Sequence, residues 1–448
     1  MSFFLTRRFF YLCTALITGF VVAFFLPWLL GPMQVLLATA VLLTLLDAAL
    51  LYAPSKGQSP VFGRRVLGEK LANGSDNDVQ LYIESRYRFG IQVEVIDEIP
   101  HQFQRRDVLF ETTIEPGQTQ VITYQLRPTK RGEYEFGAVH VYAASPLRLV
   151  RRRFRFDQAR VVPVYPSFLQ MRQYELLAIH NRLTEVGVKR IRRVGQSMEF
   201  EQIRPYAAGD DPRTINWQAS ARRATGGGDY PLVVNHFQDE RAQQVFCLID
   251  KGRVMRMPFE GLSLLDYAIN ATLVMSNIAL LKHDKAGLIT FANKPGATVP
   301  AERRPGHLRT ILEVLYRQKT QYLETDYELL YATVRARIKQ RSLLILFTNF
   351  ETLQGMQRQL PYLRGLNKSH LLLVVFFENT ELRTYLDAPA ETTADVYNQT
   401  IAEKFQQEKR QIVLELQRYG IYALLTPPHL LTANTINKYL EFKSRGLI

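Results

Sequence analysis

The stretch VFCLID at residues 245–250 decides the fold class of the C-terminal half of this 448-residue chain. Its first five residues are apolar without alternation, which is typical of a strand buried on both faces of a sheet. Comparable runs lie at 286–291, 343–347, 371–377 and 421–425, and helical patterns lie at 262–282, 306–317, 327–339 and 394–418, before a last helix. Buried strands that alternate with helices predict a parallel sheet covered on both faces. We therefore expect residues 243–448 to form a doubly wound α/β domain.

Polar residues follow the strands of this predicted sheet. Asp250 ends the first strand, Thr325 and Asp326 precede a helix, and Thr348-Asn349 follow the strand at 343–347. In a parallel sheet, ligands bind at the carboxyl ends of the strands, near the point where the strand order switches. We expect these side chains to meet at one rim of the sheet.

The rim resembles that of the von Willebrand factor A type, in which the first strand ends in D-x-S-x-S and later loops add a threonine and an aspartate. The resemblance implies a divalent cation, usually magnesium, that accepts a carboxylate from a partner. The corresponding positions here are Asp250, Gly252, Val254, Thr325 and Asn349. Two hydroxyls and one carboxylate are thus replaced, and Lys251 and Arg253 add positive charge. Because a hard dication needs oxygen ligands, we expect a degenerate site without a bound ion.

A longer motif occupies residues 199–222. It resembles E-F-x-x-x-R-x-Y-x-x-G-D-D-x-R-x-I-x-W-x-x-x-A-R, the signature of the bacterial family called domain of unknown function 58. The residues that match it include Glu199, Phe200, Arg204, Tyr206, Gly209, Asp210, Asp211, Arg213, Asn216, Trp217 and Arg222. The sequences RGEY and FG at 131–137 and LDYA at 265–268 also agree. The resemblance implies a membrane-anchored partner of MoxR-type AAA ATPases that helps to assemble or mature other complexes.

The signature segment has three interpretations. Asp210 and Asp211 could form a structural ion-pair network with Arg213, Arg204 and Glu199. The segment could instead be a surface on which a partner docks, or the two aspartates could be a catalytic carboxylate pair. The structural network is the prediction we favour, and we expect the side chain of Trp217 to be packed rather than to stack on a ligand.

Residues 57–165 show a different pattern. Short runs with alternating apolar residues lie at 79–83, 91–96, 120–124 and 139–142, and turn-forming residues separate them. Short strands at this spacing predict a small β-sandwich. Residues 166–242 would then connect the β-sandwich to the α/β domain.

The N-terminus, residues 1–56, carries two apolar runs. Residues 9–30 contain no charge and span roughly 33 Å as a helix, about the thickness of the bilayer core. Gly31-Pro32 breaks the run, and residues 33–52 form the second. A signal peptide is the rival interpretation, but its apolar region covers only about 7–15 residues. We therefore predict a transmembrane helix hairpin.

Charges beside the hairpin predict its orientation. Arg7 and Arg8 precede the first helix, and Lys56, Arg64 and Arg65 follow the second, so both flanks should remain in the cytoplasm. The protein is then a multi-pass protein of the inner (cytoplasmic) membrane with both termini in the cytoplasm. Asp47 is the charge within the second run, and it either reaches toward the interface or makes a helix-packing or partner contact.

Composition narrows the function further. Lys and Arg total 56 and Asp and Glu 42, giving a net charge of +14, but the basic clusters are spread along the chain. We expect them to face an anionic leaflet rather than nucleic acid. The two cysteines indicate a reducing compartment without a disulfide framework.

The chain lacks H-E-x-x-H, G-x-S-x-G and the phosphate loop G-x-x-x-x-G-K-[ST]. We therefore expect a non-enzymatic membrane scaffold without a cofactor, whose partner is a MoxR-type AAA ATPase. A metal-dependent adhesion module is the first alternative. A hydrolase that uses Asp210 and Asp211 is the second, although nothing supplies it with a nucleophile.

Overall fold

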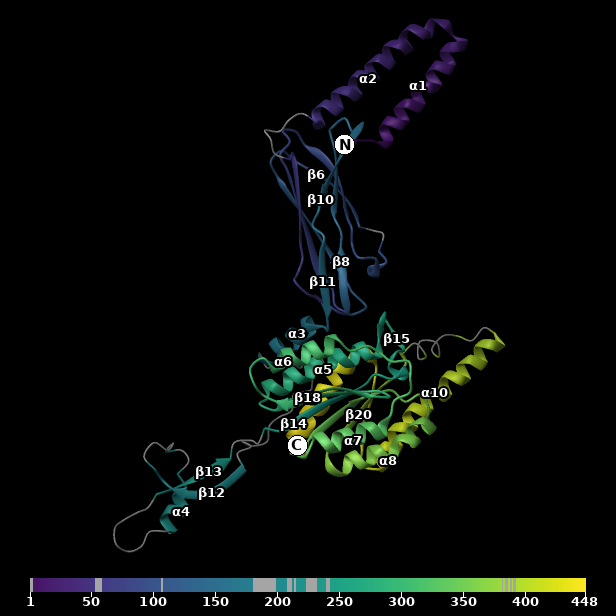
Figure 1. The fold of residues 1–448 in the computed structure, drawn as a ribbon. Helices are drawn as coiled ribbons and strands as arrows, with labels where there is room; N and C mark the ends of the chain where they lie inside the picture. Colours follow the sequence, from purple (N-terminus) through teal and green to yellow (C-terminus); the bar gives the residue numbers. More distant parts are fainter. Residues whose placement is uncertain are drawn as a thin grey trace. The chain divides into compact units, whose positions relative to one another are not determined.

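The computed structural model describes residues 3–52, 59–105, 108–179, 199–207, 212, 215–222, 232–238, 242–380, 382, 386, 389 and 392–448. The chain divides into two compact units, Met1–Leu169 and Gln170–Ile448. Figure 1 shows the helix pair and β-sheets of the first unit and the mixed helices and strands of the second.

The N-terminal helices form a hairpin. Helix α1 spans Arg7–Phe25 and α2 spans Leu30–Tyr52, and both are long and apolar enough to cross a membrane. The turn between them is a short 3-10 segment, Pro27–Leu29, rather than the predicted break at Gly31-Pro32. The prediction was wrong because proline is tolerated in the first turn of a helix, where its missing N–H has no intrahelical partner. A third long apolar helix, α5 (Leu264–Leu281), is buried inside the second unit.

The rest of the first unit consists of β-sheets around one core. The strands are β1 (Phe3–Leu5), β2 (Val61–Val66), β3 (Leu71–Ala72), β4 (Asn77–Ser85), β5 (Ile91–Asp97), β6 (Leu109–Ile114), β7 (Thr119–Leu126), β8 (Gly132–Phe136), β9 (Val139–Ala144), β10 (Val150–Phe156) and β11 (Arg160–Tyr165). They form the sheets β1-β10-β9-β5-β6, β3-β11-β8 and β2-β4-β7. Alternate residues of these strands point inward, for example those of β5, and pack into a shared hydrophobic cluster. We refer to this part of the unit, residues 59–165, as the β domain.

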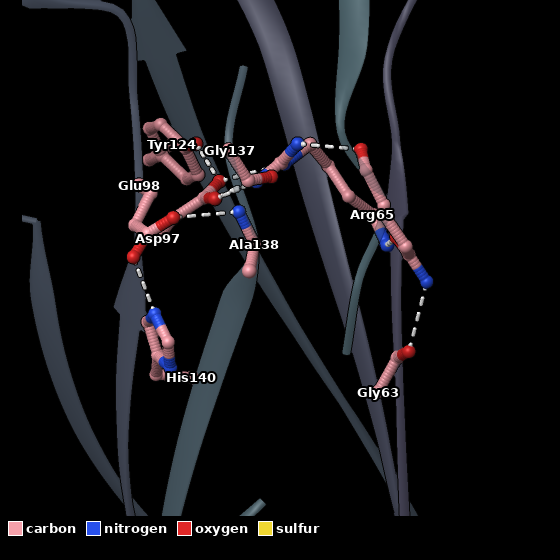
Figure 2. Close-up of polar contacts among 9 residues, drawn as sticks. Gly63, Arg65, Asp97, Glu98, Tyr124, Gly137, Ala138 and His140 are labelled. Atoms are coloured by element: carbon pink, nitrogen blue, oxygen red, sulfur yellow. Dashed lines mark hydrogen bonds and ion pairs between the residues drawn. The ribbon is translucent and has the colours of Figure 1, made fainter. Parts of the chain in front are cut away.

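A buried ion pair fixes the middle of the β domain (Figure 2). The guanidinium of Arg65, on β2, contacts the carboxylate of Asp97, on β5, and both side chains are almost fully buried. The Tyr124 hydroxyl, from β7, donates to the same carboxylate. Arg65 also donates to the Gly137 carbonyl at 3.0 Å, and it stacks on the Phe136 ring at 5.2 Å. The FG pair singled out in the sequence therefore serves to hold a charged side chain that joins several strands.

The hairpin is joined to the turn between β9 and β10. The Asp47 side chain is fully buried and accepts hydrogen bonds from the backbone N–H groups of Leu149 (2.9 Å) and Val150 (2.8 Å) and from the Ser145 hydroxyl. On the other helix, the Thr6 hydroxyl donates to the Leu149 carbonyl at 3.1 Å. The observed partner of Asp47 is thus a turn of the β domain rather than another helix, and its reach toward the interface stays a prediction.

The second unit contains a six-stranded sheet of order β18-β17-β14-β19-β20-β21. Its strands are β14 (Gln244–Asp250), β17 (Lys285–Phe291), β18 (Pro295–Glu302), β19 (Leu343–Phe347), β20 (Leu371–Phe377) and β21 (Tyr422–Thr426). Adjacent strands are parallel except for the edge strand β18, which pairs antiparallel with β17. The continuous apolar runs lie where the sequence predicts strands.

Helices cover both faces of this sheet. They are α3 (Phe168–Ile179), α6 (His307–Tyr316), α7 (Tyr327–Arg337), α8 (Leu353–Ser369), α10 (Thr393–Arg418) and α11 (Leu431–Ser444), together with α5. Successive residues of β14 face opposite sides: Cys247 packs with α5, α6 and α11, and Leu248 packs with α7, α8 and α10. This two-sided burial explains why the strands have no polar alternation.

Candidate functional site

The predicted rim at the carboxyl ends of the parallel strands is present, and Asp250 lies at its centre. The Asp250 carboxylate is fully buried. One oxygen accepts hydrogen bonds from the Thr325 hydroxyl at 2.5 Å and the Gly252 N–H at 2.8 Å, and the other accepts from the Thr348 hydroxyl at 2.7 Å. Burial raises the pKa of Asp250, and the three hydrogen bonds oppose that rise.

A tyrosine extends this network. The Tyr327 hydroxyl, from the first residue of α7, lies 2.7 Å from the Thr348 hydroxyl. Burial raises the pKa of Tyr327 well above its ordinary value, and the Asp250 charge adds to the effect. Asp326 begins α7 as its N-cap, because its side chain accepts from the Leu329 N–H. A chain of hydrogen bonds therefore runs along the rim from Tyr327 through Thr348 and Asp250 to Thr325.

A half-buried lysine occupies the neighbouring position. The Lys409 ammonium, from α10, donates to the Asn349 side-chain oxygen at 2.6 Å and to the Phe350 carbonyl. Burial lowers the pKa of Lys409 to about 8, and the Glu351 charge opposes the shift. Asp250, Val254, Thr325 and Asn349 line one pocket of about 120 Å³ with Arg253 and Arg358. The structure thus brings the five predicted positions together, since Gly252 is bonded to Asp250.

Several contacts at the rim compete with the dication that the resemblance implies. Each ligand oxygen of Asp250 already accepts a hydrogen bond, and the Asn349 oxygen is bound to the Lys409 ammonium. A Cβ atom placed on Gly252 would overlap the Thr325 hydroxyl, so a serine there has no room unless Thr325 moves. A hard cation needs several oxygen ligands, and Gly252 and Val254 supply no side-chain oxygen, although Glu324 and Glu351 also line the pocket. The degenerate site therefore stays a prediction.

Thr348, Tyr327 and Lys409 are the parts of the rim that the sequence alone did not identify. Thr348 lies beside the predicted Asn349 but enters the network through its own hydroxyl. Lys409 reaches Asn349 across 60 residues of chain. The helical pattern around Lys409 carries no signal that its side chain is half-buried.

The signature segment folds as a hairpin with a short helix. Strand β12 (Glu199–Pro205) pairs antiparallel with β13 (Val233–Gln238), and α4 (Trp217–Arg222) lies between them in sequence. Asn216 begins α4: its side-chain oxygen accepts from the Ala219 N–H at 2.9 Å, and its amide donates to Asn235 at 2.9 Å. The Ser220 hydroxyl in turn accepts from the Val233 N–H at 3.0 Å, which fastens α4 to β13.

The predicted packing of Trp217 is wrong, because its side chain is 66% exposed. The residue occupies the first position of α4, directly after Asn216, whose side chain caps the helix. Tyr206 and Ile203, on the same hairpin, are each 37% exposed. Gly209, Asp210, Asp211 and Arg213 lie outside the described residues, so the predicted ion-pair network and the carboxylate pair stay predictions.

Residues 202–386 match the protein family described as "Protein of unknown function DUF58". A segment of 132 residues is 29% identical to "Uncharacterized protein YeaD" of Bacillus subtilis (strain 168). That match covers 29% of this chain and 31% of that protein. The match to the family includes the signature residues from Arg204 onward and the rim from Asp250 to Asn349.

Two solved structures are similar to about a quarter of the chain. The PapD-like domain 7 of human CEP192 is 12% identical, with a TM-score of 0.19, and the match covers 26% of this chain and 96% of that domain. The CARDB domain of PF1109 from Pyrococcus furiosus is also 12% identical, with a TM-score of 0.17, over 23% of this chain and 91% of that domain.

Proposed function

We propose that this protein is a non-enzymatic scaffold anchored in the inner membrane, with both termini in the cytoplasm. It presents an α/β domain of the von Willebrand factor A type to a MoxR-type AAA ATPase, and so serves the assembly or maturation of other complexes. The resemblance of residues 199–222 to the signature of the family supports this partner. The two apolar helices α1 and α2 support the anchor.

The exposed aromatic face of the signature segment is the observation that carries the proposal. Trp217 is held outward on α4, whose start and whose contact with β13 are both fixed by side-chain hydrogen bonds. Tryptophan and tyrosine are enriched in the centres of protein interfaces because they bury a large area with little conformational freedom to lose. A fixed hairpin that displays Trp217 and Tyr206 is well suited to dock a protein.

The rim supports a binding role rather than a catalytic one. A nucleophile or general base needs an unoccupied atom directed at the substrate. The Asp250 carboxylate is instead enclosed by its three hydrogen-bond donors. The scaffold needs no cofactor for the proposed role, and it has no need of nucleic acid.

Affinity capture of the full-length protein from mild-detergent extracts tests this function. We expect mass spectrometry to recover a MoxR-type ATPase with the wild-type protein and several-fold less with Trp217→Ala. Tyr397→Ala is the matched control, because Tyr397 is an aromatic residue of similar exposure, 68%, on α10. Failure to recover the ATPase with any variant would count against the proposed partner. Equal recovery of the ATPase with Trp217→Ala and Tyr397→Ala would show that Trp217 is not part of the docking surface.

A metal-dependent adhesion module that binds a partner carboxylate is the rival. Metal analysis of the purified protein separates the two readings, because adhesion of this kind requires a stoichiometric divalent cation at Asp250. Stoichiometric magnesium or manganese that is lost in Asp250→Asn would favour the rival.

A further inference from the structure

The turn between β9 and β10 lies between the ends of both membrane helices. Thr6, which precedes α1, bonds to the carbonyl groups of Arg148 (2.5 Å) and Leu149 (3.1 Å). Asp47, near the end of α2, accepts from the N–H groups of Leu149 and Val150. The same turn therefore holds the start of α1 and the end of α2, which lie on the same side of the helix hairpin.

This attachment determines the depth of the turn if the helices span a membrane. Strand β1 pairs with β10 up to Leu5, and α1 begins two residues later at Arg7. Leu51, in the last turn of α2, is fully buried in the core of the β domain. The hydrocarbon layer consequently begins beside the turn, and the headgroup layer surrounds it.

The exposed residues of the turn suit a headgroup layer. Leu147 is 39% exposed and Pro146 next to it is also exposed, so the tip of the turn is apolar. Arg148 follows at once and is half-buried, with its backbone in the left-handed region at φ 57°. Arg7 and Arg8 are exposed at the start of α1. An apolar tip flanked by arginines matches an interface with anionic lipid.

A second loop adds to the same end of the β domain. The Tyr87 hydroxyl donates to the Leu51 carbonyl at 2.8 Å, which places the loop after β4 against the end of α2. Arg86 and Arg88 of this loop are exposed. Two acidic residues also lie here: Glu84 pairs with Arg86 at 2.7 Å, and Glu115 lies on the neighbouring turn between β6 and β7. These two acids balance the two arginines of the loop, so the basic excess at this end of the β domain comes from Arg7, Arg8 and Arg148.

We propose that the β9–β10 turn, residues 145–150, is a lipid-contacting element whose tip inserts Leu147 among the headgroups and whose Arg148 selects anionic phospholipid. The inference rests on the membrane anchoring proposed above. Its consequence is that the β domain is held against the bilayer surface at two places, by the helices and by the turn, and does not swing on a tether.

Lipid selectivity of the full-length protein tests the role of Arg148. The protein is purified in mild detergent, equilibrated with equimolar phosphatidylglycerol and phosphatidylcholine, and the retained lipids are counted by native mass spectrometry. We expect the wild-type protein to retain phosphatidylglycerol in preference to phosphatidylcholine. In Arg148→Gln the ratio of retained phosphatidylglycerol to phosphatidylcholine should fall about fivefold, because one basic side chain contributes about 1 kcal/mol to binding of anionic lipid. Arg160→Gln is the control, because Arg160 is exposed on β11, beyond the far end of β10 from the turn.

The depth of the turn is measured separately. A nitroxide on Leu147→Cys and one on Ala159→Cys are compared in liposomes, with labelled wild type as the background for the native cysteines. We expect oxygen to relax the label at position 147 more than a polar nickel chelate does, and the reverse at 159. A polar environment at 147, or an equal loss of lipid preference in Arg148→Gln and Arg160→Gln, overturns the proposal. Loss of the wild-type protein from the membrane fraction would instead refute the anchoring itself.

Discussion

Replacement of Asp47 by alanine should detach the hairpin from the β domain. The carboxylate is fully buried and accepts from Leu149 N–H, Val150 N–H and the Ser145 hydroxyl. Alanine removes all three acceptor contacts at once. The two backbone N–H groups then stay in a buried position without a partner, because the rest of the turn is unchanged.

The magnitude follows from these contacts. A hydrogen bond to a charged group contributes about 1.5–3 kcal/mol, so the two N–H groups together account for about 3–6 kcal/mol. The cost of burying the carboxylate, which alanine does not bear, offsets part of this sum. We expect the free energy of local opening at the turn to fall by about 3 kcal/mol, or about a hundredfold in the opening equilibrium. Asp47→Asn keeps one acceptor oxygen and should lose about half as much free energy.

Amide hydrogen exchange of full-length protein in lipid nanodiscs measures the effect directly. The exchange of Leu149 and Val150 should accelerate about a hundredfold in Asp47→Ala and about tenfold in Asp47→Asn. Thr44→Ala is the control, because the Thr44 hydroxyl bonds only to the Ala40 carbonyl of its own helix among the contacts described. Unchanged exchange in Asp47→Ala, or equal acceleration in Thr44→Ala, would refute the reasoning.

Three further predictions concern the β domain and the rim. Asp97→Ala leaves the buried guanidinium of Arg65 unpaired and should cost about 3–5 kcal/mol in denaturant unfolding of the β domain; a loss below 1 kcal/mol would contradict a buried ion pair. Gly252→Ser should lower the melting temperature, because the new side chain overlaps the Thr325 hydroxyl. Titration calorimetry should detect no magnesium binding by this variant. Tight magnesium binding would show that the Thr325 side chain moves to make room for the serine. Lys409 has a pKa lowered to about 8 by burial, so the unfolded chain binds more protons between about pH 8 and its ordinary pKa of 10.5, and stability should rise with pH in that window. The denaturant midpoint of wild type should therefore rise relative to that of Lys409→Met between pH 8 and pH 10. A difference that stays constant over this range would contradict the lowered pKa of Lys409.

The strands of the second unit were largely predictable, whereas some of its other elements were not. The continuous apolar runs that form β14, β19 and β20 signal burial on two faces within a few residues. Helix α8 was missed because Gly355, Pro361 and Gly365 interrupt its sequence, and its stability comes from packing of residues such as Leu363 against the sheet. Strand β18 was missed because prolines occupy both its start and its interior, as an edge strand permits.

The candidate site divides in the same way. Asp250 and Thr325 were predictable because a strand end and a helix start place them at the rim. The other residues of the rim were not predictable. Thr348, rather than the neighbouring Asn349, bonds to Asp250, and Lys409 comes from a helix 60 residues further along the chain than Asn349. The exposure of Trp217 was also missed, because hydrophobicity predicts burial for a tryptophan and no local pattern shows which residues of a short helix stay exposed.

The sequence by itself determined the two apolar helices, the alternating strands of the β domain and the buried strands of the parallel sheet. These features follow from periodicity over a few residues, which the chain encodes locally. Only the tertiary structure decided that Asp47 binds a turn about 100 residues away and that the Lys409 ammonium binds Asn349, which holds one of the ligand positions of the resemblance. Such contacts depend on how whole elements pack, and no local pattern records which buried charge will meet which partner.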